Sequence, residues 1–81
     1  MRKDPLVELV VSEVGAPLAV DGGATVLLGV EEGIAHVRYR PGHNEGCPEC
    51  IMSTEDMREY LREALSARAP YIQDVEIVAA P

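Results

Sequence analysis

Two cysteines, Cys47 and Cys50, are separated by two residues, and the chain of 81 residues contains no other cysteine. Cysteine thiolates bind soft metals such as zinc and iron, and they also exchange with disulfides. A four-sulfur metal site needs four thiolates, so one such pair cannot complete it. The two cysteines are therefore half of a metal site, a redox dithiol or an incidental pair.

The position of this pair favours negative charge on sulfur. Cys50 lies within about a turn of a predicted helix start, where unsatisfied N–H groups and the helix dipole stabilise a thiolate. Pro48 should stiffen the turn between the two sulfurs, because its ring fixes one backbone angle. Glu45 and Glu49 act in the opposite direction, since their charges oppose further anions and should weaken the retention of an anionic metal cluster.

The composition limits the remaining function classes. A chain of 81 residues with 47% apolar residues supports one small domain, and the absence of Phe and Trp leaves its core to aliphatic side chains and Met. A net charge of −7 repels phosphate backbones and anionic lipids, so we expect neither nucleic acid nor a membrane as partner. No apolar stretch approaches the length of a membrane span. One close cysteine pair fits a reducing compartment, so we expect a cytoplasmic protein.

Hydrophobic periodicity and turn residues predict five elements. Apolar residues at helical spacing follow a candidate cap at Asp4, and Ser53 with Asp56 resembles a capping box ahead of a second amphipathic helix. The second helix should end near Ala69, because Pro70 disfavours helix in the residue before it. The predicted elements are a helix at 5–14, two strands at 24–31 and 34–40 joined by a short reversal, the helix after the capping box, and a strand at 73–78.

These elements predict an α+β fold with the order α-β-β-α-β. Both helices should lie on one face of a three-stranded sheet, which gives a small two-layer α/β domain spanning residues 1–81. The order of the strands stays open. The segment Pro41–Gly46 is predicted to be a loop that carries Cys47 to the edge of the sheet.

A series of motifs follows one order along residues 14–78. An Asp-Gly-Gly turn precedes two strands, a glycine-containing loop, the cysteine pair, a Ser-Thr turn, an amphipathic helix, and a late proline and valine. This series resembles the C-terminal domain of NifU, the Nfu-type iron–sulfur module. The matching positions are Asp21, Gly22, Gly23, Cys47, Cys50, Ser53, Thr54, Met57, Leu61, Leu65, Pro70 and Val75.

The resemblance implies an iron–sulfur cluster scaffold or carrier rather than an enzyme, with no catalytic residue. It implies that Cys47 and Cys50 bind iron of a four-iron four-sulfur (4Fe–4S) cluster. Since one chain supplies two of the four ligands, the same cysteines of a second subunit would complete the site at a homodimer interface. The cluster would then pass to acceptor apo-proteins.

Two other functions remain open from the sequence. A glutaredoxin-like thiol–disulfide oxidoreductase also places Cys-Pro-x-Cys before a helix, but there the motif follows the first strand, whereas Cys47 lies past the midpoint of this chain. A zinc-stapled interaction module would use the same sulfurs for structure alone. We expect His36 to be an exposed strand residue and His43 to be a solvated loop histidine, with contact to the metal site as the alternative role of His43.

Overall fold

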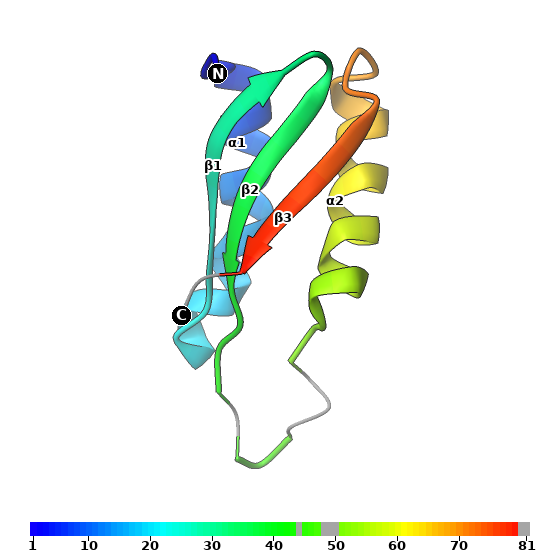
Figure 1. Ribbon diagram of the computed structural model, residues 1–81. Coiled ribbons are helices and arrows are strands. Elements are labelled where there is room, and N and C mark those ends of the chain that lie inside the picture. Colours follow the sequence, from blue (N-terminus) through cyan, green and yellow to red (C-terminus); the bar gives the residue numbers. More distant parts are fainter. Residues whose placement is uncertain (44, 48–50, 80–81) are drawn as a thin grey trace.

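The computed structural model describes residues 1–43, 45–47 and 51–79 of the chain (Figure 1). Two α-helices and three strands follow one another in the predicted order, with a 3-10 helix after the first helix. The elements are α1 (Pro5–Gly15), η1 (Ala16–Asp21), β1 (Ala24–Glu31), β2 (Ile34–Arg40), α2 (Thr54–Arg68) and β3 (Asp74–Ala79). The predicted α+β class is confirmed. Within the described residues, no helix is long and apolar enough to cross a membrane.

The sheet has the strand order β1-β2-β3, so β2 lies in the centre. β1 and β2 are antiparallel, and the turn between them uses positive φ angles at Glu32 (52°) and Gly33 (78°), as a tight type I′ hairpin requires. β3 pairs with β2 in parallel, because the chain crosses the sheet through α2 before it returns. At the outer edge of β1, Arg2 forms a two-hydrogen-bond bridge with Val30, with N–O distances of 3.1 and 2.6 Å.

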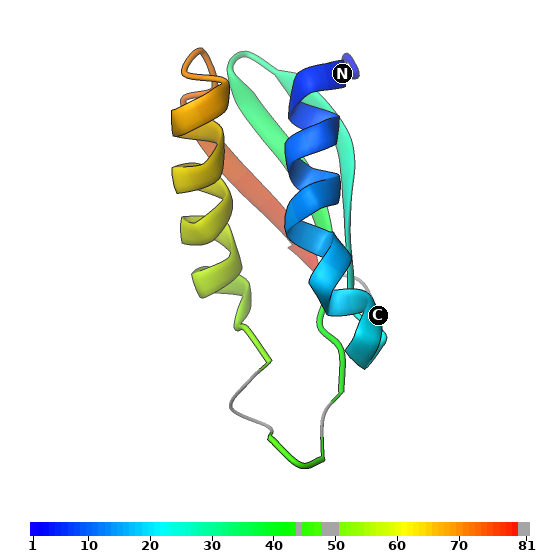
Figure 2. The same ribbon diagram turned by 180° about the vertical axis from the view of Figure 1, so that it is seen from behind.

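Both helices pack on the same face of the sheet, as the sequence predicts (Figures 1 and 2). Most of the buried side chains between these layers are aliphatic, and Tyr39 supplies an aromatic ring. Tyr60 is 51% exposed although its spacing fits the apolar stripe of α2, because it lies about 100° around the helix from Leu61, which faces the sheet. The buried core comprises Val7, Val10, Val11, Leu27, Ala35, Val37, Tyr39, Met57, Leu61, Leu65, Ala69, Ile72 and Val75.

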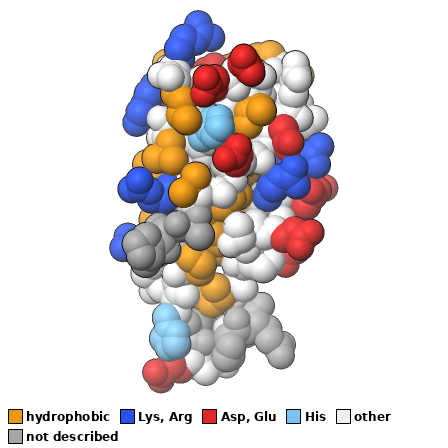
Figure 3. Space-filling model, viewed as in Figure 1, with side chains coloured by type: hydrophobic (Ala, Val, Ile, Leu, Met, Phe, Trp, Pro, Cys, Tyr) orange, Lys and Arg blue, Asp and Glu red, His pale blue; other side chains and the backbone are white. Residues whose placement is uncertain are grey.

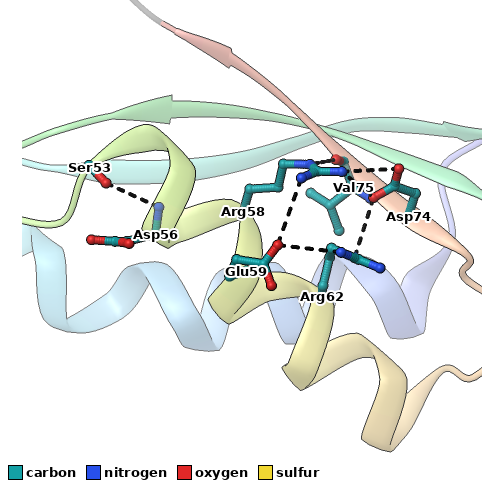
Figure 4. Close-up of polar contacts among 7 residues, drawn as sticks. All are labelled: Ser53, Asp56, Arg58, Glu59, Arg62, Asp74 and Val75. Carbon is teal, nitrogen blue, oxygen red and sulfur yellow. Dashed lines mark hydrogen bonds and ion pairs between the residues drawn. The ribbon is translucent and has the colours of Figure 1, made fainter.

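Each α-helix begins at a side-chain cap that the sequence predicts. The Asp4 carboxylate accepts hydrogen bonds from the N–H groups of Leu6 (3.0 Å) and Val7 (3.2 Å) at the start of α1. The Ser53 hydroxyl accepts one from the N–H of Asp56 (3.1 Å) at the start of α2 (Figure 4). These caps fix where both helices begin, and the second cap follows the cysteine segment directly.

The cap of α1 is also tied to the far end of the chain. The Tyr71 hydroxyl donates a hydrogen bond to Asp4 Oδ2 (2.5 Å), across the gap between α1 and the turn before β3. This hydrogen bond is the main cause that lowers the pKa of Asp4 below its usual range, and the two N–H groups at the helix start lower it further. The same bond raises the pKa of Tyr71. The contribution of this pair to the free energy of unfolding should therefore depend on pH in the acid range.

We expect Tyr71→Phe to flatten the acid dependence of stability. Because the folded-state pKa of Asp4 is depressed, its contribution is present above the unfolded-state pKa of about 3.9 and is lost as pH falls through the lower folded-state value. Urea denaturation between pH 2 and pH 7 should show that wild type and Tyr71→Phe differ most above about pH 5 and converge at the acid end. Tyr60→Phe, at an exposed tyrosine of α2, is the matched control. A difference that stays constant across this pH range would contradict the assignment.

Candidate metal centre

Both cysteines belong to the segment that joins β2 to α2, at one end of the sheet (Figure 1). Cys47 lies in the described part of this segment and is disulfide-bonded, so metal binding by its thiolate requires prior reduction. Cys50 lies outside the described residues, together with Pro48 and Glu49. The predicted convergence of two sulfurs therefore stays a prediction, and what the structure adds is how the segment is held at its two ends.

The first end of the segment is held by the Asp-Gly-Gly turn at 21–23. The N–H of His43 donates a hydrogen bond to the carbonyl of Asp21 (2.8 Å). A Cβ atom on Gly42 would overlap the backbone of Asp21, so the close approach of these two chains requires glycine. Gly22 adopts a φ of 79°, which turns the chain from η1 into β1. The turn therefore braces the first end of the cysteine segment.

The second end is held by Tyr39, near the end of β2. Its hydroxyl donates a 2.6 Å hydrogen bond to the carbonyl of Met52, the last residue but one before α2. The Tyr39 side chain is almost completely buried, and this burial raises the pKa of its phenol, so the hydroxyl keeps its proton at neutral pH. One side chain thus connects the buried core to the second end of the cysteine segment.

A polar cluster fixes α2, the helix that follows the cysteines, against β3 (Figure 4). Arg58 Nε donates to the carbonyl of Val75 (2.9 Å), and Arg58 Nη2 donates to both carboxylate oxygens of Asp74 (2.9 and 3.2 Å). Arg62 Nε lies 3.4 Å from the same carboxylate. The pKa of Asp74 is lowered, first by the N–H of Val75 and then by the charges of the two arginines. This cluster anchors α2 along the sheet edge.

The two histidines differ in their surroundings. The His43 side chain is 82% exposed, and its Nε2 lies 3.6 Å from Glu45 Oε1, which agrees with the predicted solvated loop histidine. The prediction that His36 is exposed is wrong, because its side chain is only 14% exposed. Its Nδ1 lies 3.8 Å from Oε2 of Glu76, its partner on the neighbouring strand β3. Among the residues that the structure describes, no group of three or more Cys, His, Asp or Glu side chains is placed to hold a metal ion.

A surface groove of about 470 Å³ lies between α2 and the start of β3, away from the cysteine segment. Its floor is formed by Ile72 and Val75, and its walls carry the paired charges of Arg62 and Asp74. These ion pairs are satisfied within the chain. The groove therefore brings no further metal-binding group to the cysteines.

Sequence reasoning missed the bracing roles of the turn at 21–23 and of Tyr39. The sequence predicts the loop at Pro41–Gly46 and the turn at 21–23 as two separate features. No local pattern indicates that they contact each other. One available signal was Gly42, a glycine at the start of the loop that no turn type demanded. The position of Tyr39 in an alternating strand pattern indicates that its ring is buried. The pattern does not indicate which group accepts the hydrogen bond of its hydroxyl.

We expect Tyr39→Phe to loosen the second end of the cysteine segment. The ring would still fill the core, but the carbonyl of Met52 would lose its partner, which should lower the free energy of unfolding by about 1 kcal/mol. Amide hydrogen exchange should accelerate at residues 51–53 more than in the middle of α1. The Tyr60→Phe variant is the control for loss of a hydroxyl elsewhere. Equal exchange rates at 51–53 in wild type and Tyr39→Phe would contradict the bracing role.

The motif series and the braced segment agree with the comparison to known protein families. The family model described as the NifU-like domain matches residues 7–76 of the chain. The matched span includes both cysteines, the turn at 21–23 and all three strands except the last residues of β3. A search of curated proteins and a search of solved structures gave no match. Because the family model covers most of the chain, the protein belongs to the NifU-like domain family, whose members serve in the assembly of iron–sulfur clusters.

Proposed function

We propose that the protein carries a 4Fe–4S cluster as cargo, bound by Cys47 and Cys50 from each of two copies, and transfers it to acceptor apo-proteins. In this proposal residues 1–81 act as one NifU-like domain and the homodimer forms on cluster binding. The observation that carries the proposal is a cysteine-bearing segment that is held at both ends, in a chain of this family.

The chemistry of the ligands supports a shared site. Iron in these clusters is bound by thiolates, and a cubane cluster takes four of them. One chain contains two cysteines, so two copies related by a two-fold axis supply the full set. Among the described residues, no group of three or more Cys, His, Asp or Glu side chains lies together that could hold a metal ion within one chain.

The position of the segment supports release as well as binding. It extends from one end of the sheet, beyond the helices, and its described residues Glu45 and Gly46 are exposed (Figures 1 and 2). A second copy, and then an acceptor, can therefore approach without unfolding the core. Transfer is a ligand exchange in which four iron–cysteine bonds break and four form with acceptor thiols. The acceptor protons pass to the released thiolates or to water, and iron and sulfide keep their oxidation states.

One observation favours a second candidate function. Cys47 is disulfide-bonded, which is also the oxidised state of a thiol–disulfide oxidoreductase. The position of the cysteines after β1 and β2 argues against a glutaredoxin-like enzyme, and the family match favours cluster assembly. The two functions are separated by whether the reduced protein retains iron and sulfide or turns over a disulfide substrate.

We expect anaerobic reconstitution of the reduced protein with iron and sulfide to give broad visible absorption and a dimer that binds about four irons. Cys47→Ser and Cys50→Ser should each abolish both the absorption and the cluster-dependent dimer on a sizing column, because each variant removes two of the four ligands. His43→Ala, at an exposed loop residue, should retain both properties. Circular dichroism checks that the variants keep their fold.

Three results would contradict the proposal in different ways. Cluster binding that survives both serine variants would exclude the two cysteines as ligands. Tight zinc binding with no iron–sulfur absorption, and unfolding on chelation, would indicate a zinc-stapled module. Catalytic turnover of a disulfide such as hydroxyethyl disulfide, without cluster retention, would indicate the oxidoreductase.

A further inference from the structure

The face of the sheet opposite the helices is not covered by any helix (Figures 1 and 2). Two valines on this face are well exposed: Val26 on β1 is 49% exposed and Val78 on β3 is 40% exposed. The strand register places both beside Arg38 of the central strand, so the three residues form one row across the sheet. Figure 3 shows this face, with hydrophobic side chains along the strands, Lys and Arg side chains at both margins, and Asp and Glu side chains at the top and on the right.

Arg38 and Arg40 lie on this face, and together with Arg2 at the start of the chain they are the arginines for which the described residues supply no ion pair. The chain has 14 acidic residues and only 7 basic ones, so a carboxylate could easily pair with each arginine. Neither Arg38 nor Arg40 has an ion-pair partner in the part of the chain that the structure describes. The basic residues that do pair with carboxylates are Lys3, Arg58, Arg62 and Arg68.

This face leads directly to the cysteine segment. β2 carries Arg38 and Arg40 and ends at Arg40, and the braced residues Gly42 and His43 follow at once. A partner that lies on the exposed face near the end of β2 would therefore be next to the segment that carries Cys47. The location fits a surface that positions a partner for exchange at that segment.

We propose that this face, defined by Val26, Arg38, Arg40 and Val78 and called the docking face below, binds the acceptor protein through a surface that combines carboxylates with apolar side chains. The role of docking in cluster transfer rests on the proposed function, whereas binding of a partner to this face does not depend on it. Because this chain is acidic overall, most of its surface repels a carboxylate-bearing partner, and the two unpaired arginines favour docking at this face.

Charge argues against two other occupants. A second copy docked through the same face about a two-fold axis would bring the Arg38 and Arg40 side chains of both copies together, which is unfavourable. Nucleic acid would meet two unpaired arginines on a chain with a net charge of −7, and long-range repulsion would dominate. A protein surface with carboxylates and apolar residues matches both the row of valines and the free cations.

The test uses a stated probe, the apo form of a small acidic ferredoxin with four reduced cysteines. The cluster-free, reduced protein is labelled with ¹⁵N and titrated with this probe at low and high salt. We expect amide shifts along Val26, Arg38 and Val78, with binding that weakens at high salt. Arg38→Gln should weaken binding on the order of fivefold, and Arg68→Gln, which makes the same change in net charge on the helix side of the sheet, should not.

A second arm measures transfer from the reconstituted protein to the same probe. Arg38→Gln should slow the second-order transfer rate on the order of fivefold at low salt, while cluster content stays at the wild-type level. If the wild-type protein never retains a cluster, the proposed function fails, and the binding arm still reports on the docking face.

Three outcomes would overturn the docking face. Shifts confined to α2 would place the partner on the opposite side of the molecule. Equal affinities for Arg38→Gln and Arg68→Gln would show that only net charge acts. A dimer of the cluster-free protein that Arg38→Gln disrupts would assign the face to a second copy.

Discussion

The hydrogen bond between Tyr39 and the carbonyl of Met52 is the interaction on which the arrangement of this protein depends. The core contains no Phe or Trp, and Tyr39 is its bulkiest buried side chain. The same ring that fills the space between helices and sheet therefore also determines where α2 begins relative to β2. In a chain this small, packing of the core and positioning of the cysteine segment depend on the same residue, Tyr39, so a change in one affects the other.

The first end of the cysteine segment is held by close backbone contact rather than by a buried side chain. The turn at 21–23 meets Gly42 at a distance that leaves no room for a side chain, and one backbone hydrogen bond joins His43 to Asp21. A hydrogen bond to the backbone does not depend on which side chain occupies position 43. The two ends of the cysteine segment are thus held by different physical means, one by an aromatic hydroxyl and the other by close backbone approach.

Most of the fold could be predicted from the sequence because the signals are local. Helical spacing, the caps at Asp4 and Ser53 and the turn at Gly33 each act over a few residues, and the predicted bounds agree closely with the structure. The strand order and the burial of His36 could not be predicted, since they depend on which strands meet across the sheet. The candidate site was predicted as a cysteine pair, but its braces join residues distant in sequence, and Cys50 lies outside the described residues.

The contact between Arg58 and the carbonyl of Val75 has a consequence for association. Exposed strand edges invite further strands, which leads to open-ended aggregation. Arg58 occupies the outward carbonyl of Val75, the carboxylate of Asp74 occupies its N–H, and Arg2 occupies the outer edge of β1 at Val30. At the end of the sheet away from the cysteines, one residue on each edge strand is therefore unavailable for pairing with a further strand. When two copies of this acidic protein meet in solution, strand pairing at that end of the sheet is therefore disfavoured.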